Sequence, residues 1–262
     1  MTPKDWIEDA TRQLTEAGVS SPRLDAQLLV EYATGRDRAS LSIDESTELD
    51  IKILNKQLER RIRREPLAYI LGSREFYGLD FIVSESVLVP RPETEVMVEK
   101  AINEAPESSS VLELGTGSGC ISIALSKNRP DLSILATDVS FDALGVAQKN
   151  NEEHKTNVKF HHSDLFKSLR GTYDVILANL PYVPEPARRQ PEITHEPDVA
   201  LYGGEDGLDY YRTFFAEVSD YLEDQGFMIV EFSPTQFAAA RSEFSDFTFE
   251  PLSEYIYFVE PN

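Results

Sequence analysis

The chain has 262 residues, 41% hydrophobic and 27% charged, which is ordinary for a globular protein of one large domain or two smaller ones. A single cysteine, Cys120, excludes an internal disulfide and suits a reducing compartment. The start lacks a signal-peptide core and no apolar stretch reaches membrane-spanning length, so we expect a cytoplasmic protein without a membrane partner.

The net charge of −21 is unevenly distributed. Residues 1–78 carry 12 basic and 14 acidic side chains, whereas residues 79–262 carry 13 and 32, a net charge of −19. Contacts to phosphates dominate the affinity of proteins for nucleic acids, so the second part would repel them. We therefore expect no direct binding of nucleic acid.

The first part predicts a small helical bundle. Apolar residues recur with helical spacing over residues 3–18, 22–34 and about 47–64. The third helix ends in an arginine cluster that suits a helix carboxyl end and leaves open a contact with an acidic partner. That cluster consists of Arg60, Arg61, Arg63 and Arg64.

A β-hairpin is predicted next, from residues 76–83 and 87–89. It suggests a helical domain over 1–75 and a hairpin linker over 76–91.

From residue 92 to 262, predicted helices and strands alternate. This alternation predicts an α/β domain with a mostly parallel sheet, whose site lies at the carboxyl ends of the strands. The strands are expected at 111–114, 133–137, 157–160, 174–178 and 226–232, the helices at 93–103, 120–127, 141–153 and 208–222, and a closing hairpin at 248–259.

A glycine loop joins the first of these strands to its helix. Glycines allow a backbone to approach a ligand without a clash from Cβ, and a strand, glycine turn and helix in this order form a nucleotide-type crevice. The loop consists of Gly115, Thr116, Gly117, Ser118 and Gly119. A plain tight turn would give the same pattern.

Asp138 follows the second strand, 23 positions after Gly115. An acidic residue at this place accepts hydrogen bonds from ribose hydroxyls. Together with the glycine loop and the motif of residues 179–182 that follows the strand at 174–178, Asp138 points to S-adenosylmethionine and to methyl transfer to nitrogen. The four histidines show no ligand spacing, so no metal site is expected.

Asn179, Leu180, Pro181 and Tyr182 directly follow the strand at 174–178. The side-chain oxygen of Asn179 and the backbone carbonyls beside Pro181 can accept both hydrogens of a planar NH2 group, either of an amide or of an amino-purine. Tyr182 can cover the flat face of that group, and Pro181 stiffens the loop. We predict Asn179, Pro181 and Tyr182 as catalytic residues and all four as substrate-binding residues. A strand that ends in a proline turn is the simpler interpretation of these four residues alone.

Several segments together resemble the HemK/PrmC family, the peptide chain release factor glutamine methyltransferases. The resemblance covers nearly the whole chain, and residues 90–95 are closer to the release-factor enzymes than to relatives that act on a ribosomal protein. The segments are residues 66–72, 74–76, 87–95, 113–119, 163–164, 196–197, 203–208 and 211–212.

The resemblance implies a helical substrate-recognition domain, a hairpin linker and a Rossmann-like class I methyltransferase domain with S-adenosylmethionine as methyl donor. It further implies N5-methylation of the glutamine in the Gly-Gly-Gln motif of release factors, in support of translation termination. A monomer is expected.

Two positions depart from the family pattern. Leu180 stands where the family motif, Asn-Pro-Pro-Tyr, has its first proline. Leu165 stands where relatives often place an aromatic residue beside the adenine, and Phe166 follows it. We accordingly expect Leu165, Phe166 and Asn179 to contact the cofactor together with the glycine loop and Asp138.

Three other functions are considered: a glutamine methyltransferase of a ribosomal protein, an adenine-N6 nucleic-acid methyltransferase, and a donor-binding module that has lost its chemistry. The charge of −19 over residues 79–262 argues against the nucleic-acid enzyme. The intact glycine loop and Asn179 argue against a lapsed module.

Overall fold

The computed structural model describes residues 2–36, 48–185 and 191–262, which form two compact units. The first unit contains the described residues up to Gly72 together with the segment 191–195. The second begins at Ser73, runs to residue 185 and resumes at Glu196. The first unit therefore ends before the expected boundary at residue 75, and it includes a segment that the sequence assigned to the other domain.

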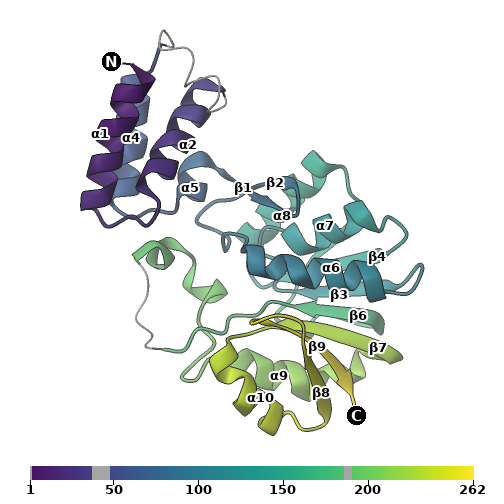
Figure 1. Cartoon of the computed structure of the whole chain (residues 1–262). Coiled ribbons are helices and arrows are strands. Elements are labelled where there is room, and N and C mark those ends of the chain that lie inside the picture. Colours follow the sequence, from purple (N-terminus) through teal and green to yellow (C-terminus); the bar gives the residue numbers. More distant parts are fainter. Residues whose placement is uncertain (1, 37–47, 186–190) are drawn as a thin grey trace. The chain divides into compact units, whose positions relative to one another are not determined.

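The first unit is a helical bundle, as predicted (Figure 1). Thr2 begins the first helix with a capping box, in which its hydroxyl accepts from the Asp5 N–H and the Asp5 carboxylate accepts from the Thr2 N–H. Trp6 donates from Nε1 to Oδ1 of Asn55, 3.0 Å away, which ties α1 (Pro3–Glu16) to α4 (Ile51–Ile62). The expected start at residue 47 lies outside the described residues. The bundle also contains α2 (Pro22–Thr34) and the short α5 (Leu67–Leu71).

The arginine cluster at the end of α4 mostly holds carboxylates of the chain itself. Arg61 donates to the buried Asp25 carboxylate at 2.7 Å and to Glu192 at 3.1 Å. Arg60 pairs with Glu65, and Arg64 also binds Glu192. Since three of the four arginines are engaged in this way, the suggested contact with an acidic partner is not supported for them.

The hairpin is confirmed, but its predicted position was wrong. β1 (Ser73–Phe76) pairs with β2 (Leu79–Ile82), while residues 87–89 form no strand. The turn residues Tyr77 and Gly78 both have positive φ, 52° and 74°, which suits a two-residue turn whose twist matches that of the strands. The prediction failed because it took this turn for the interior of a strand.

The second unit contains a seven-stranded sheet in the order β5-β4-β3-β6-β7-β9-β8. The first five strands are parallel, and β9 is antiparallel to both of its neighbours, which confirms the predicted α/β class. The chain reverses its direction of travel across the sheet between β3 and β6, where ligand crevices form. The strands are β3 (Ser110–Leu114), β4 (Ser133–Asp138), β5 (Lys159–His162), β6 (Tyr173–Ala178), β7 (Leu222–Glu231), β8 (Phe247–Pro251) and β9 (Ile256–Pro261).

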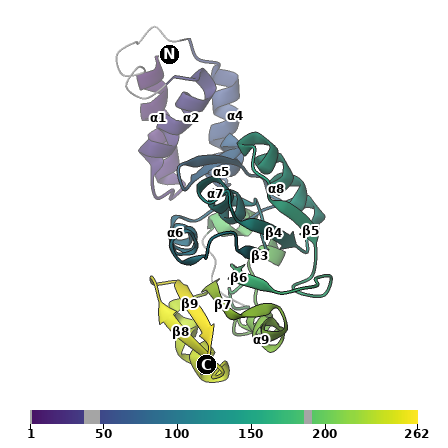
Figure 2. The ribbon, with the colours of Figure 1, turned by 90° about the vertical axis from the view of Figure 1, so that its right-hand side faces the viewer.

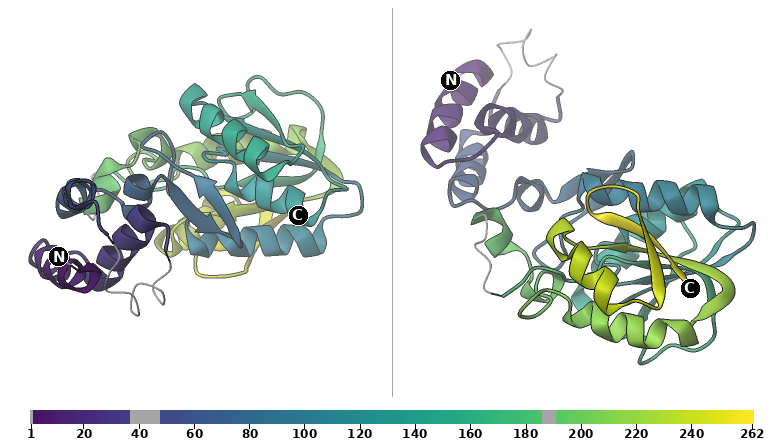
Figure 3. Two further views of the ribbon diagram at one scale, coloured as in Figure 1. Left: turned by 90° about the horizontal axis from the view of Figure 1, so that it is seen from above. Right: turned by 60° about the horizontal axis from the view of Figure 1, so that its bottom comes forward.

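Each face of the sheet is covered by helices, because successive residues of a strand point to opposite faces. Val175 and Leu177 of β6 join the core with α6 and α7, whereas Ile176 and Ala178 join the core with α9 and α10. Figure 2 shows α6 and α9 on opposite sides of the strands, and Figure 3 shows the closing β8–β9 hairpin. The helices are α6 (Glu95–Glu104), α7 (Cys120–Asn128), α8 (Phe141–His154), α9 (Asp209–Glu217) and α10 (Phe237–Glu243). Within residues 2–36, 48–185 and 191–262, no helix is long and apolar enough to cross a membrane.

Candidate active site

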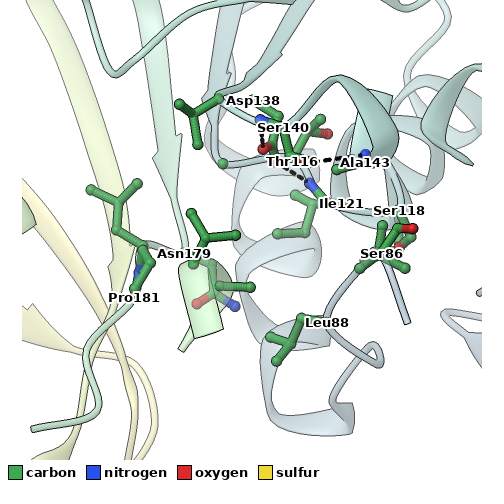
Figure 4. A pocket seen from close by; sticks show the side chains of 18 of the residues that line it. Ser86, Leu88, Thr116, Ser118, Ile121, Asp138, Ser140, Ala143, Asn179 and Pro181 are labelled. Carbon is green, nitrogen blue, oxygen red and sulfur yellow. Dashed lines mark hydrogen bonds between the residues drawn. The ribbon is translucent and has the colours of Figure 1, made fainter. Parts of the chain in front are cut away.

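A pocket lies at the carboxyl ends of β3, β4 and β6, where the topology places a crevice (Figure 4). Its lining brings together most of the residues predicted as the site. These are Gly115, Thr116, Gly117, Ser118, Asp138, Leu165, Asn179, Leu180 and Pro181. Gly119, Phe166 and Tyr182 are not part of this lining.

The three glycines of the loop all have positive φ, between 55° and 81°. A Cβ on Gly117 would meet no atom within 4 Å, so this glycine faces the open space of the pocket. A Cβ on Gly119 would lie 2.9 Å from Cδ1 of Ile123 and 3.2 Å from Cβ of Ala147. Gly117 therefore allows a ligand to approach the backbone, while Gly119 allows α7 and α8 to pack closely.

Asp138 is held by the backbone and still has acceptor capacity. Its Oδ2 accepts from the Gly117 N–H at 2.9 Å and its Oδ1 from the Ser140 N–H at 2.8 Å. Burial raises the pKa of Asp138, although these two hydrogen bonds oppose the shift. Since a carboxylate has about four acceptor positions, Asp138 keeps capacity to accept from a hydroxyl of a ligand. Beside it, the apolar Val139 lines the pocket with 44% of its surface exposed, which fits a flat base next to a ribose.

Glu113 lies under the glycine loop and is almost completely buried. Its carboxylate accepts from the Thr116 hydroxyl at 2.7 Å. Burial raises the pKa of Glu113 to about 7, although hydrogen bonds from Thr116 and Ser122 oppose the shift. The loop is therefore attached to a carboxyl group that changes its charge near neutral pH.

Leu165 and Phe166 point to different surroundings. Leu165 has a φ of 47° and lines the pocket. The Phe166 side chain is completely buried and stacks on the Tyr221 ring with a centroid distance of 4.5 Å. The Phe166 ring therefore belongs to the core beneath the pocket and not to the pocket lining, and its expected contact with the cofactor stays a prediction.

Asn179 is the first residue after β6, and Leu180 is anchored in the core behind it. The Leu180 side chain is 3% exposed, and its N–H donates to the Tyr211 hydroxyl at 3.3 Å. A Cβ on Gly115 would lie 3.4 Å from Cδ2 of Leu180. The leucine that replaces the family's proline thus packs against the first glycine of the loop.

Two further glycines support the loop from behind. A Cβ on Gly203 would lie 2.5 Å from the Pro181 carbonyl oxygen, and a Cβ on Gly207 would lie 2.2 Å from the Tyr182 carbonyl oxygen. Nε2 of Gln236 also donates to the Tyr182 carbonyl oxygen at 2.8 Å. The segment 203–208, recognised only as a family signature, therefore serves as the backing of the loop.

Residues 87–94 contribute a wall of the pocket that sequence reasoning did not assign to the site. Leu88, Arg91 and Thr94 line it. Arg91 donates from Nη2 to the buried Glu196 at 2.6 Å, and Glu196 also accepts from the Val89 N–H. The only signal for this wall was the resemblance of residues 87–95 to the family.

Cys120 also lines the pocket, at the start of α7. Burial raises the pKa of its thiol to about 12. The thiol is therefore protonated at neutral pH and is a packing residue, not a nucleophile.

Comparison with known proteins agrees with this architecture. The PrmC N-terminal domain family matches residues 5–72, and the methyltransferase small domain family matches residues 92–196. The crystal structure of a methyltransferase from Pyrococcus furiosus is 19% identical, covers 77% of this chain and 96% of its own, and superposes with a TM-score of 0.56. The 16S rRNA N2 G1207 methyltransferase of Thermus thermophilus, solved with AdoMet and guanosine, is 18% identical over 72% of this chain and 49% of its own, with a TM-score of 0.52. At these identities the two structures establish the fold alone.

A curated relative carries the assignment further. The release factor glutamine methyltransferase of Geobacter sulfurreducens is 39% identical over 255 residues, which cover 93% of this chain and 90% of the relative. Agreement of this extent spans the helical unit, the pocket and the loop that begins at Asn179. The chain therefore belongs to the release factor glutamine methyltransferase family, the S-adenosylmethionine-dependent protein-glutamine methyltransferases.

Proposed function

We propose that this chain methylates the side-chain nitrogen of the glutamine in the Gly-Gly-Gln motif of peptide chain release factors. The observation that carries the proposal is that Asn179 lines the same pocket as Gly117 and Asp138. An acceptor for an amide NH2 group and a cradle for a nucleoside-type donor thus share one cavity.

The donor is expected to lie between the glycine loop, Asp138 and Leu165. Gly117 leaves room for it, Asp138 has free lone pairs for ribose hydroxyls, and Val139 offers apolar surface to the base. When bound, S-adenosylmethionine supplies an electrophilic methyl group on a sulfonium.

The loop residues orient the acceptor amide. The Pro181 carbonyl is turned toward Gly203, so we assign the second acceptor to the Leu180 carbonyl and the first to Oδ1 of Asn179. An amide nitrogen is a weak nucleophile because its lone pair is delocalised into the carbonyl group. Two acceptors on its N–H bonds stabilise the positive charge that develops on the nitrogen, and fixed alignment provides further acceleration.

We assign no side chain as general base. The methylated nitrogen is expected to lose its proton to water after the transfer. The covering of the flat amide face by Tyr182 remains a prediction, because the Tyr182 hydroxyl is engaged by Glu231 and its ring does not line the pocket.

Partner recognition is proposed for the helical unit. A glutamine amide presents the same atoms in any protein, so the loop after β6 alone offers little selectivity. We assign residues 1–75 to binding of the intact factor, and we place the chain in the cytoplasm as a monomer, where release factors act.

An assay with labelled donor and purified acceptors tests the proposal. We expect rapid methylation of an intact bacterial release factor and none of a factor whose Gly-Gly-Gln glutamine is replaced by asparagine. Ribosomal proteins and adenine-containing DNA duplexes are expected to remain unlabelled. Preferred labelling of a ribosomal protein or of DNA would overturn the assignment in favour of that substrate.

A further inference from the structure

Glu231 is a buried carboxylate that no step of the proposed reaction uses. It ends β7, and the register pairs Val230 of β7 with Ala178 of β6. The next residues along each strand, Glu231 and Asn179, therefore lie at the same level of the sheet. Only 2% of the Glu231 surface is exposed, although a buried carboxylate is costly unless donors surround it.

Two hydroxyl groups from the proposed site donate to this carboxylate. The Thr94 hydroxyl donates to Oε2 at 2.6 Å, and the Tyr182 hydroxyl donates to Oε1 at 3.2 Å. Burial raises the pKa of Glu231, while hydrogen bonds from Thr94 and Tyr182 oppose the shift. Glu231 thus connects Tyr182, the last residue of the loop motif, with the wall formed by residues 87–94.

The direction of these bonds determines how the Asn179 amide is oriented. Nδ2 of Asn179 donates to Oγ1 of Thr94 at 3.5 Å. Because the Thr94 hydroxyl gives its hydrogen to Glu231, its oxygen can only accept from Asn179. This arrangement directs Nδ2 toward Thr94 and leaves Oδ1 for the pocket. The opposite orientation would present an NH2 group to the NH2 group of a bound glutamine.

We propose that Glu231 is a positioning residue that acts through Thr94 to keep the Asn179 side-chain oxygen directed at the substrate amide. The inference deepens the proposed function and relies on the same loop. Glu231 itself contacts neither the substrate glutamine nor the methyl donor in this scheme.

A double-mutant cycle tests the inference. Thr94→Val removes the hydroxyl at nearly constant volume, Thr94→Ser keeps it, and Glu231→Gln removes the charge. We expect Thr94→Val and Glu231→Gln to slow single-turnover methyl transfer by about 10- to 100-fold, with donor dissociation constants changed by less than about threefold. Thr94→Ser should slow methyl transfer far less, because it keeps the hydroxyl. In an Asn179→Ala background, the same two substitutions should slow methyl transfer by less than about threefold, because the side chain through which they act is already absent.

A second measurement needs no substrate. In nitrogen-15 spectra, hydrogen exchange of the Asn179 side-chain amide should be slow in the wild type and in Thr94→Ser, and faster by about tenfold in Thr94→Val and Glu231→Gln. If the exchange rate of the Asn179 amide were unchanged in Thr94→Val and Glu231→Gln, the positioning role would be overturned. The same conclusion would follow if each substitution slowed methyl transfer as much in the Asn179→Ala background as in the wild type. If the Asn179 amide exchanged faster in the two variants but the wild type methylated no release factor, the positioning role would be supported and the proposed function refuted.

Discussion

Arg64 binds Glu192 through two parallel hydrogen bonds of 2.8 Å, from Nε to Oε1 and from Nη2 to Oε2, across 128 positions of the sequence. Bidentate pairs of this kind combine strength with a fixed geometry. They hold the segment 191–195 within the helical unit, and in the sequence this segment closely follows the loop that begins at Asn179.

Replacing Glu192 should release that segment. In Glu192→Ala, we expect amide hydrogen exchange of residues 191–195 to accelerate by about 10- to 100-fold, since hydrogen bonds to charged groups contribute about 1.5–3 kcal/mol. Glu185→Ala, which removes an exposed carboxylate from the second unit, is the matched control and should leave this exchange unchanged. Equal exchange rates in the Glu192 variant and the wild type would show that the ion pair does not anchor the segment.

Acid should have the same effect as the substitution. Burial alone would raise the pKa of Glu192, but hydrogen bonds from its own backbone, Arg64 and Arg61 outweigh it and lower the pKa. A lowered carboxyl pKa means that the anchor is fully present above the unfolded value of about 4.3 and is lost as the pH falls through the folded value. The protection factors of residues 191–195, which correct for the intrinsic slowing of amide exchange in acid, should therefore fall below about pH 4 in the wild type and hardly change in Glu192→Ala.

Asp138 is expected to contribute directly to donor affinity. Asp138→Ala should weaken donor binding, measured by calorimetry, by about 1.5–3 kcal/mol, because it removes the acceptor for ribose hydroxyls and the partner of the Gly117 N–H. Asp142→Asn removes an exposed carboxylate from the same region outside the pocket lining and should change the affinity little. A donor affinity that survives in Asp138→Ala would refute the ribose assignment.

Glu113 should make stability depend on pH. Its folded pKa, raised to about 7 by burial, exceeds the unfolded value, so the folded chain binds the proton more tightly. The stabilisation is fully present below about pH 4.3 and is lost as the pH rises through 7, a change of at most about 4 kcal/mol. Between pH 5 and 8, the free energy of unfolding should therefore decline less in Glu113→Gln than in the wild type. Glu107→Gln, at an exposed position, should follow the wild type, and an identical decline in Glu113→Gln would contradict the assigned titration.

Restoring the family's proline should destabilise this chain. Leu180→Pro removes the N–H that donates to Tyr211 and a side chain that is 97% buried, which should cost about 1–3 kcal/mol. Leu180→Met keeps the N–H and most of the volume, and it should cost less than about 1.5 kcal/mol. Denaturant unfolding of both variants measures the difference, and a Leu180→Pro protein as stable as the wild type would show that this hydrogen bond contributes nothing.

The parts of the site that the sequence predicted carry local signals. Gly117 and Asp138 each follow an apolar strand, and Asn179 begins a motif directly after another, so the topology rule was enough to bring them to one edge of the sheet. The mostly parallel α/β architecture was predicted from the alternation of strand and helix patterns.

The parts that escaped prediction depend on packing between distant segments. Glu231 ends a strand that the sequence predicts as an apolar run, and only the register of β7 against β6 places it beside Asn179. Phe166 faces the core because the chain turns at Leu165, where φ is positive. The return of residues 191–195 to the helical unit depends on Arg61 and Arg64, whose sequence context suggests only a helix end.

The position of the transferred methyl group tests the central claim most directly. An intact bacterial release factor is incubated with the chain and S-adenosylmethionine, digested, and analysed by fragmentation mass spectrometry, with Asn179→Ala as the parallel sample. We predict one methyl group on the side-chain nitrogen of the Gly-Gly-Gln glutamine and, at equal donor occupancy, a transfer rate at least about 100-fold lower in Asn179→Ala. A methyl group on any other residue, or a near-normal rate in Asn179→Ala, would contradict the account.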